Sequence, residues 1–345
     1  MAEPKPPAAK RPTMKQVAAR AGVDVSLVSR LLNDDPRLSI APDTRRRVMD
    51  AVRELGYRRN LTARSLRTSR GLMVAFLLPE FTNPVYSRIV AGAHRRAASL
   101  GYAVMLSELD DTDAEDMRGH QARGVDGVLL AAGNLEDARI AELCGGDLPV
   151  IAVNRQIPGS RRWAVVDYGL GGRLAAEHLR ELGHRRVGVL TGPGRFDSDG
   201  SRVRGFADAL GDAVGGEDPP VVVADGLTPD DGLRAGAELL ARHPEVTAVF
   251  ATTLMLGVGL LRAASEAGIA VPGELSIVSL HDVDLARFMS PPLTTVAMPM
   301  VELGAAAFDQ LLAVIDGQDP EPTVMTQPPV LVRRASTAPP RKERR

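Results

Sequence analysis

The stretch TMKQVAARAGVDVSLVSRLLN, residues 13–33, decides how the N-terminal part of the chain folds. Thr13 and Gln16 stand at the spacing of a helical capping box. The apolar residues that follow recur at helical spacing as far as Gly22, where the first helix is expected to end. Asp24 is placed to cap a second helix. The sequence therefore predicts two short helices joined by a tight turn.

The second helix is expected to have one apolar and one polar face. Its inward positions are Leu27, Val28, Leu31 and Leu32, and its outward positions are Val25, Ser26, Ser29, Arg30 and Asn33. Pro42 suits the first turn of a third helix that ends near Gly56. Three such helices can share one small core. In a helix-turn-helix the second helix enters the DNA major groove, where an outward Arg can bind guanine through two hydrogen bonds.

Charge is distributed unevenly along the chain. The 345 residues carry a net charge of −1, yet residues 1–70 hold 16 Lys and Arg against 7 Asp and Glu, whereas the remaining residues hold 26 against 36. A basic N-terminal part on an acidic body favours a polyanionic partner for the N-terminal part alone. A solvated basic face is the alternative that charge by itself leaves open.

Composition excludes several classes of protein. Hydrophobic residues make up 44% of the chain, which is enough to form the hydrophobic cores of globular domains. No apolar run approaches the roughly 18 residues of a membrane span, and the start of the chain lacks the apolar stretch of a secretory signal, so we expect a cytoplasmic protein. Cys144 is the single cysteine. Without a second thiol or clustered histidines, we expect no disulfide, no metal site and no cofactor.

From Gly71 onward, strand and helix patterns alternate. The apolar runs LMVAFLLP, YAVMLSEL, GVLLAA, PVIAVN, RVGVLTG, VVVAD, AVFATT and LSIVSLHD are mostly separated by segments of helix length. This pattern predicts parallel sheets covered on both faces, in two doubly wound lobes. There is no G-x-S-x-G, Walker loop or complete G-x-G-x-x-G, so we expect no enzyme and no catalytic residues. His184, His243 and His281 are dispersed and are interpreted as surface or strand-end histidines.

Three runs carry a resemblance to a known family. They are TMKQVAARAGVDVSLVSRLLN at 13–33, TRRRVMDAVRELGY at 44–57 and NLTARSLRTSRGLMVAFLLP at 60–79. Together they resemble the N-terminal part of the LacI/GalR (lactose-repressor) family of bacterial transcription regulators, and the resemblance extends over nearly the whole chain. It implies a repressor that binds a palindromic double-stranded DNA operator as a homodimer and responds to a small, polar, sugar-like effector.

The resemblance also implies a division into domains. The fold class is a small all-α helix-turn-helix domain followed by two α/β lobes that resemble a periplasmic binding protein. The expected parts are a disordered tail at 1–12, the helix-turn-helix domain at 13–57, a hinge helix or linker at 58–70, an effector-binding and dimerisation domain at 71–335, and a disordered tail at 336–345. Within the effector-binding domain, the first lobe is expected to take about residues 71–167 and 299–322, and the second about 168–298 and 323–335.

By the same resemblance, residues 58–70 form a hinge helix that orders on the operator and inserts Leu66 between base steps in the minor groove. At about eight residues, NLTARSLR is too short to be stable alone, and a basic linker is the alternative. Asp24 and Leu27 stand where the family usually has Ser and Thr, and a carboxylate is unfavourable beside a phosphate. The candidate DNA-binding residues are Thr13, Lys15, Val25, Ser26, Ser29, Arg30, Asn33, Arg58, Arg59, Asn60, Arg64, Leu66 and Arg67.

Candidate effector residues lie at strand ends, where open α/β sheets bind ligands. The resemblance implies Val85, Tyr86, Asn154, Asp167, Phe196, Arg202, Leu227, Thr253 and Asp282. Of these, Arg202 and Asp282 match the family's ligand-gripping Arg and Asp. A salt bridge between lobes or a helix cap is the alternative role for such residues.

Departures from the family pattern leave the effector open. Asn154 replaces a frequent aspartate, Leu227 an aromatic residue, and Thr252-Thr253 an Asn-Asp pair. A hexose is the family's commonest effector class, but a nucleoside, an acid or no ligand remain alternatives for this chain. A regulator controlled by a protein partner and a cytosolic sugar-binding protein without DNA function are the other functions left open.

Overall fold

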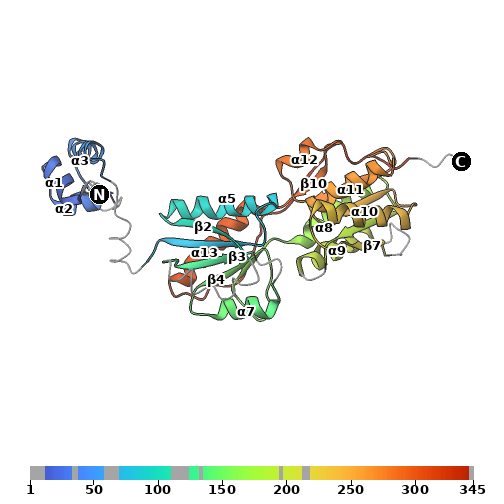
Figure 1. Cartoon of the computed structure of the whole chain (residues 1–345), viewed down its shortest axis with the longest axis horizontal. Helices are drawn as coiled ribbons and strands as arrows, with labels where there is room; N and C mark the ends of the chain where they lie inside the picture. Colours follow the sequence, from blue (N-terminus) through green and yellow to red (C-terminus); the bar gives the residue numbers. More distant parts are fainter. Residues whose placement is uncertain are drawn as a thin grey trace, which may run out of the picture. The chain divides into compact units, whose positions relative to one another are not determined.

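The chain forms two units, residues 1–70 and 71–345. The computed structural model describes residues 12–32, 38–57, 70–109, 124–131, 135–193, 197–211 and 218–341. Figure 1 shows the helices and strands of both units. Within the described residues, no helix is long and apolar enough to cross a membrane.

The N-terminal unit contains α1 (Met14–Ala21), α2 (Val25–Leu32) and α3 (Pro42–Glu54). The capping box is confirmed, because the Gln16 N–H donates to Thr13 Oγ1 at 3.4 Å and the Thr13 N–H donates to Gln16 Oε1 at 2.8 Å. Gly22 ends α1 at φ 66°, a left-handed conformation that glycine adopts without strain. The shared core consists of Val17, Ala18, Ala21, Val28, Leu31, Leu32, Val48 and Ala51.

The larger unit is built on two six-stranded sheets. The first has the order β11-β5-β4-β3-β1-β2, with β1 (Met73–Leu78), β2 (Ala103–Glu108), β3 (Gly127–Leu130), β4 (Val150–Val153), β5 (Trp163–Val165) and β11 (Thr323–Val324). The second has the order β12-β10-β9-β8-β6-β7, with β6 (Val187–Thr191), β7 (Val221–Val223), β8 (Ala248–Ala251), β9 (Ser276–Leu280), β10 (Thr294–Ala297) and β12 (Val330–Val332). β12 runs antiparallel to β10, and the other paired strands are parallel. The predicted doubly wound lobes are confirmed.

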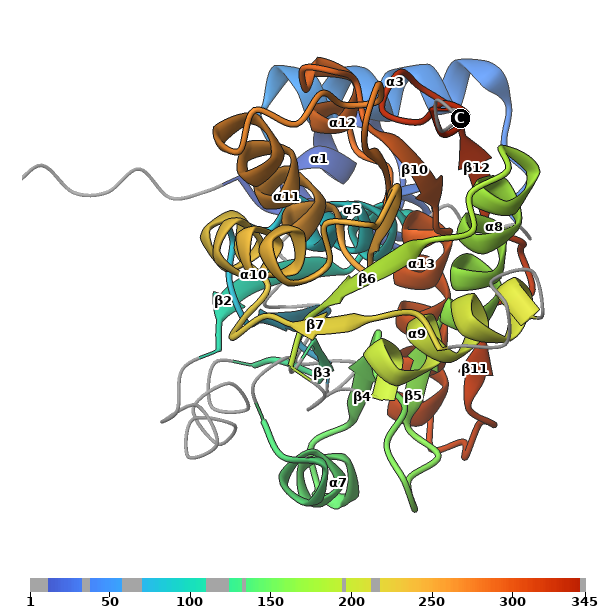
Figure 2. The ribbon, with the colours of Figure 1, turned by 90° about the vertical axis from the view of Figure 1, so that its right-hand side faces the viewer.

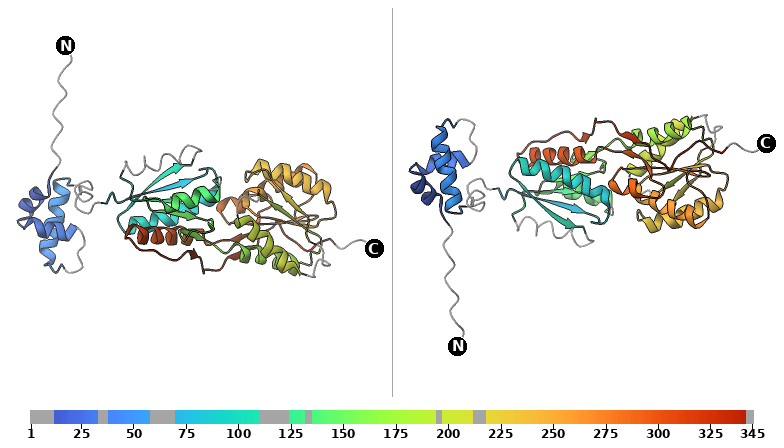
Figure 3. Two further views of the ribbon diagram at one scale, coloured as in Figure 1. Left: turned by 90° about the horizontal axis from the view of Figure 1, so that it is seen from below. Right: turned by 90° about the horizontal axis from the view of Figure 1, so that it is seen from above.

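Helices cover both faces of each sheet, as Figures 2 and 3 show. In the first lobe, α5 (Pro84–Ser99) and α13 (Met300–Ile315) share one face and α7 (Asp137–Gly145) covers the other. In the second lobe, α8 (Tyr168–Glu181) and α9 (Asp197–Leu210) share one face, while α10 (Pro229–Arg242), α11 (Leu254–Glu266) and α12 (Asp284–Phe288) pack on the other. One core cluster continues from the α5–α13 side of the first lobe to the α8–α9 side of the second.

The chain passes between the lobes three times, as the resemblance implied. It crosses after β5, after β10 and after β11. The expected boundary at residue 323 is wrong, because Thr323 pairs with Ala164 and so adds β11 to the first sheet. Gln310 of α13 holds the segment before β11 against the first lobe, because its Nε2 donates to the backbone oxygen of Glu321 at 3.0 Å.

The segment 334–338, which we call the C-terminal strap, packs onto the second sheet. Ser336 is fully buried, and its Oγ donates to the Ile277 oxygen at 2.6 Å. His184 Nε2 lies 2.9 Å from the Ala338 oxygen. The expectation of a disordered tail at 336–345 is therefore wrong for the described residues 336–341. Its polar composition suggested solvation, but its hydroxyl and carbonyl groups find hydrogen-bond partners in the sheet.

Candidate functional site

The exposed face of α2 is the candidate DNA interface. Val25, Ser26 and Arg30 are exposed there, while the opposite side of the helix is buried in the three-helix core. Asp24 Oδ1 accepts from the Ser26 N–H at 2.7 Å, and the hydrogen bonds from Ser26 hold the pKa of Asp24 below its usual value. An ionised Asp24 stabilises the start of α2, where the helix dipole favours negative charge. The predicted cap is thus confirmed as local structure, and so are the outward positions of Val25, Ser26 and Arg30.

The other candidate DNA-binding residues are placed only in part. Thr13 and Lys15 are exposed at the start of α1, and Ser29 is half-buried on α2. The hinge helix and the candidates Asn33, Arg58, Arg59, Asn60, Arg64, Leu66 and Arg67 lie outside the described residues. The described part of the unit presents an exposed Arg and small side chains on one helix, a surface that can contact base edges in a major groove.

In the larger unit, Tyr168 brings two candidate effector residues together. It is the first residue of α8, at a crossing between lobes, and it is 3% exposed. Its hydroxyl donates to Asn154 Oδ1 of the first lobe at 2.7 Å. The Arg202 guanidinium lies 3.8 Å from the centre of its ring. Asn154 and Arg202, chosen separately from the sequence, therefore contact the same aromatic side chain from different lobes.

Close packing of α8 against α9 positions Arg202. A Cβ atom on Gly172 would lie 2.2 Å from the backbone oxygen of Arg202, and one on Gly205 would lie 2.1 Å from the oxygen of Gly169. Only glycine permits this approach of the two backbones. A larger residue at either position would push α9, and Arg202 with it, away from Tyr168.

His281 completes this cluster from the second lobe. Its ring meets that of Tyr168 edge to face, with the centroids 5.7 Å apart. His281 is 4% exposed, and burial, followed by the charge of Arg202, lowers its pKa well below the usual value, so the ring is neutral near pH 7. Its φ of +70° turns the chain sharply after β9. The prediction of a strand-end histidine is confirmed, but the side chain is buried rather than at the surface.

Asp282 forms an ion pair within the second lobe. Its Oδ1 lies 2.7 Å from Arg334 Nη2 and accepts a hydrogen bond from Thr295 Oγ1 at 2.6 Å. The side chain remains 24% exposed. The salt-bridge alternative is thus present for Asp282, although within one lobe rather than between two, and its partial exposure leaves the carboxylate open to further donors.

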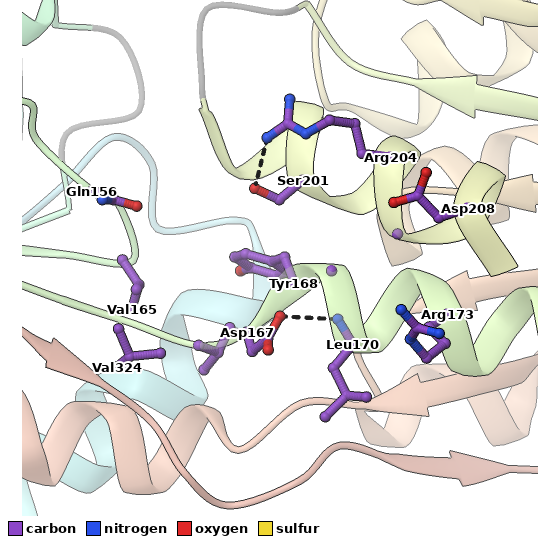
Figure 4. Close-up of a pocket in the computed structure, with 13 residues that line it drawn as sticks. Gln156, Val165, Asp167, Tyr168, Leu170, Arg173, Ser201, Arg204, Asp208 and Val324 are labelled. Atoms are coloured by element: carbon purple, nitrogen blue, oxygen red, sulfur yellow. Dashed lines mark hydrogen bonds between the residues drawn. The ribbon is translucent and has the colours of Figure 1, made fainter.

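A pocket of about 440 Å³ lies beside Tyr168 at the seam between the lobes. In Figure 4, Gln156, Val165 and Val324 border it from the first lobe, and Ser201, Arg204, Arg173 and Asp208 from the second. Asp167 is the one candidate effector residue among its lining residues, and it also caps α8 by accepting from the Leu170 N–H at 2.9 Å. The Tyr168 ring therefore borders the pocket and also contacts Asn154, Arg202 and His281.

The remaining candidate effector residues take other places. Thr253 caps α11, and its hydroxyl accepts from the Leu256 N–H at 3.3 Å. Leu227 packs against the core under α10 and α11. Val85 is buried and Tyr86 half-buried in the first turn of α5. Phe196 lies outside the described residues.

Three residues of this region were missed by reasoning from the sequence. They are Tyr168, His281 as a contact residue, and Arg334. Tyr168 and His281 are each next to a candidate, Asp167 and Asp282, so a search one residue to either side would have found them. No local signal distinguished Arg334 from the other arginines near the C-terminus.

Two family models match the chain. The model of bacterial regulatory proteins of the lacI family matches residues 13–60, and the model of the periplasmic binding protein-like domain matches residues 176–337. The first covers the three-helix unit, and the second covers most of the second lobe and α13.

Full-length relatives extend this similarity over almost the whole chain. The HTH-type transcriptional regulator DegA of Bacillus subtilis is 30% identical over 334 residues, which cover 95% of this chain and 98% of that protein. The HTH-type transcriptional regulator CelR of Thermobifida fusca is 33% identical over 323 residues, covering 91% and 94%.

Solved structures are similar over the same extent. The lac repressor dimer bound to operator and the anti-inducer ONPF has a TM-score of 0.76 at 26% identity, covering 95% of this chain and all of that one. The CelR–cellobiose complex has a TM-score of 0.70 at 32% identity, covering 94% of this chain and all of that one.

Proposed function

Because this chain belongs to the LacI family of bacterial regulatory proteins, we propose that it is a transcriptional repressor whose affinity for operator DNA is set by a small polar effector. The relatives named above are transcriptional regulators rather than enzymes. The single observation that carries the proposal is the exposed face of α2 on a folded three-helix core. We place the protein in the cytoplasm, where operator DNA is found.

The proposed DNA contacts divide by position. Val25, Ser26 and Arg30 on α2 read base edges, because they are exposed on the helix that enters the major groove. Lys15 contacts phosphate, which fixes the register of the protein on DNA without selecting a sequence. For the hinge, we propose that Leu66 inserts into the minor groove, as the resemblance of the sequence to the family implies.

The proposed effector is polar and rich in hydroxyl groups. Sugar complexes of relatives, with cellobiose in CelR and ribose in another LacI-family regulator, support this class. In this chain, Arg202 supplies donors and Asp282 supplies acceptors, a combination that suits several hydroxyls and that an apolar ligand would leave unmatched. A ligand that contacts both lobes changes DNA affinity only by binding one arrangement of the lobes better than another.

We propose a homodimer as the working form. Two helix-turn-helix units related by a two-fold axis read a palindrome, and the lac repressor structure contains a dimer. On α12, Phe288 is 73% exposed and Leu285 is 42% exposed. Large apolar side chains exposed together mark an interaction surface, and we assign this one to a second copy of the chain.

Selection of operator DNA from a random pool by the full-length protein tests the proposal. Repressor function predicts a palindromic consensus and an affinity that falls steeply with salt, because phosphate contacts release counterions. A thermal-shift screen of sugars then tests the effector assignment. A pool that stays unenriched would contradict DNA reading, and sugar binding without any effect on operator affinity would contradict effector control.

A further inference from the structure

We propose that Arg334, on the C-terminal strap, is a positioning residue for the effector site. In this view, it holds the carboxylate of Asp282 in one orientation, so that the second carboxylate oxygen is directed to the hydroxyls of the ligand. The inference rests on the proposed function, in which Asp282 is an effector residue, and it adds a residue that neither the family pattern nor the pocket pointed to.

One carboxylate oxygen of Asp282 is contacted by both Arg334 and Thr295. Arg334 Nη2 lies 2.7 Å from Asp282 Oδ1, and Thr295 Oγ1 donates to the same oxygen at 2.6 Å. The two side chains of the ion pair are 24% and 16% exposed for Asp282 and Arg334, so the pair is partly shielded from water. Because Oδ1 is engaged twice and the side chain remains 24% exposed, we assign Oδ2 as the oxygen that accepts from a ligand hydroxyl.

The guanidinium plane is itself fixed by further hydrogen bonds. Arg334 Nη1 donates to the backbone oxygen of Leu293 at 2.8 Å and to Thr295 Oγ1 at 2.9 Å. Thr295 therefore accepts from Arg334 and donates to Asp282, which closes a ring of three side chains. A planar fork with several donors makes these contacts together, whereas the ammonium of a lysine is a single point of charge.

The backbone that carries Arg334 is anchored at this residue and further along the C-terminal strap. The Arg334 N–H donates to Thr294 Oγ1 at 3.0 Å, and the Thr294 N–H donates to Ser336 Oγ at 2.7 Å. Further along, the Ile277 N–H donates to the Ser336 oxygen at 2.8 Å, and His184 contacts Ala338. A side chain on a segment held this firmly keeps its partner within the narrow angular range that specific binding requires.

The test uses the full-length protein, four single variants and the double variant Arg334→Gln/Asp282→Asn. Arg334→Gln removes the charge and the fork, Arg334→Lys keeps the charge alone, and Asp282→Asn removes the partner. Arg333→Gln is the matched control, because Arg333 is the adjacent residue but is 66% exposed and pairs with Glu181 on the surface. Thermal unfolding establishes that each variant folds, and if Arg334→Gln does not fold, Arg334→Lys carries the comparison.

Two measurements follow. Calorimetric titration with cellobiose and with ribose gives the sugar affinity of each variant. In parallel, NMR of protein labelled with ¹³C at aspartate carboxyls follows the Asp282 signal without any ligand, assigned by its loss in Asp282→Asn. We expect Arg334→Gln to weaken sugar binding about tenfold or more and to shift the Asp282 signal. Arg334→Lys should recover part of both effects, and Arg333→Gln should change neither.

The outcomes separate positioning from a general structural role. If Arg334 acts through Asp282, Arg334→Gln causes no further loss of sugar affinity in the Asp282→Asn background. An equal loss in that background, or an Asp282 signal that does not move in Arg334→Gln, overturns the inference. If the wild type binds neither sugar, the sugar assignment of the proposed function fails, and the NMR measurement still decides whether Arg334 orients the carboxylate.

Discussion

Replacing Tyr168 by Phe removes one hydrogen bond between the lobes and retains the ring. The Tyr168 hydroxyl donates to Asn154 Oδ1 at 2.7 Å, which joins α8 of the second lobe to the residue after β4 of the first. The contacts of the ring with Arg202 and His281 do not depend on the hydroxyl. The substitution therefore isolates the energy of a single contact between lobes.

The expected cost is about 1 kcal/mol, within the range of about 0.5–1.5 kcal/mol for a neutral hydrogen bond. The substitution leaves Asn154 Oδ1 without its donor. Because Tyr168 is 3% exposed, water does not readily reach the place of the lost hydroxyl. Asn154 is half-buried, so it recovers part of its hydration. In a domain of about 150–250 residues, such a loss lowers the melting temperature by about 2–4 °C.

Urea unfolding of the wild type, Tyr168→Phe, Asn154→Ala and the double variant forms a mutant cycle. We expect a coupling energy of about 1 kcal/mol between the two positions. Because the contact joins the lobes, Tyr168→Phe should also shift the sugar concentration that changes operator affinity. A coupling energy below about 0.3 kcal/mol, within the error of additivity, would refute the reasoning.

Four further predictions concern other parts of the molecule. Arg30→Ala should cost about 1–3 kcal/mol in operator binding and relax preference at one base pair per half-site in competition assays; an equal loss on every sequence would rule out base reading. Asp282→Ala should abolish the sugar response in gel-shift titrations, whereas a normal response would make this residue structural. Burial lowers the pKa of His184 below 6.5, so the unfolded chain binds the proton more readily, and the free energy of unfolding should fall as pH drops below 6.5. His184→Gln should flatten that dependence in urea titrations, and an unchanged slope would assign it to other groups. Phe288→Glu should shift the protein from dimer to monomer in sedimentation, and a persistent dimer would place the interface elsewhere.

Local patterns in the sequence were enough for the N-terminal unit and for most strands. The capping box of Thr13, the left-handed turn at Gly22 and the first-turn Pro42 act over a few residues, so their structural meaning can be inferred without knowing the fold. The eight apolar runs likewise predicted eight strands of the two sheets. Those runs do not include β5, β10, β11 or β12. In β10, the buried polar residues Thr294 and Thr295 interrupt the apolar pattern that marks the other strands.

The tertiary structure alone decided which polar groups meet. Asp282 was identified as a candidate from its place after a strand, but its pairing with Arg334 follows from the strand order β12-β10-β9, which brings the end of the chain beside β10. The same order buries Ser336 where a solvated tail was expected. A residue's hydrogen-bonding capacity can be known from its type, whereas its partner depends on how distant segments are brought together when the sheets form. Sequence by itself therefore determined the elements and the candidate residues, and the order of the strands determined their contacts.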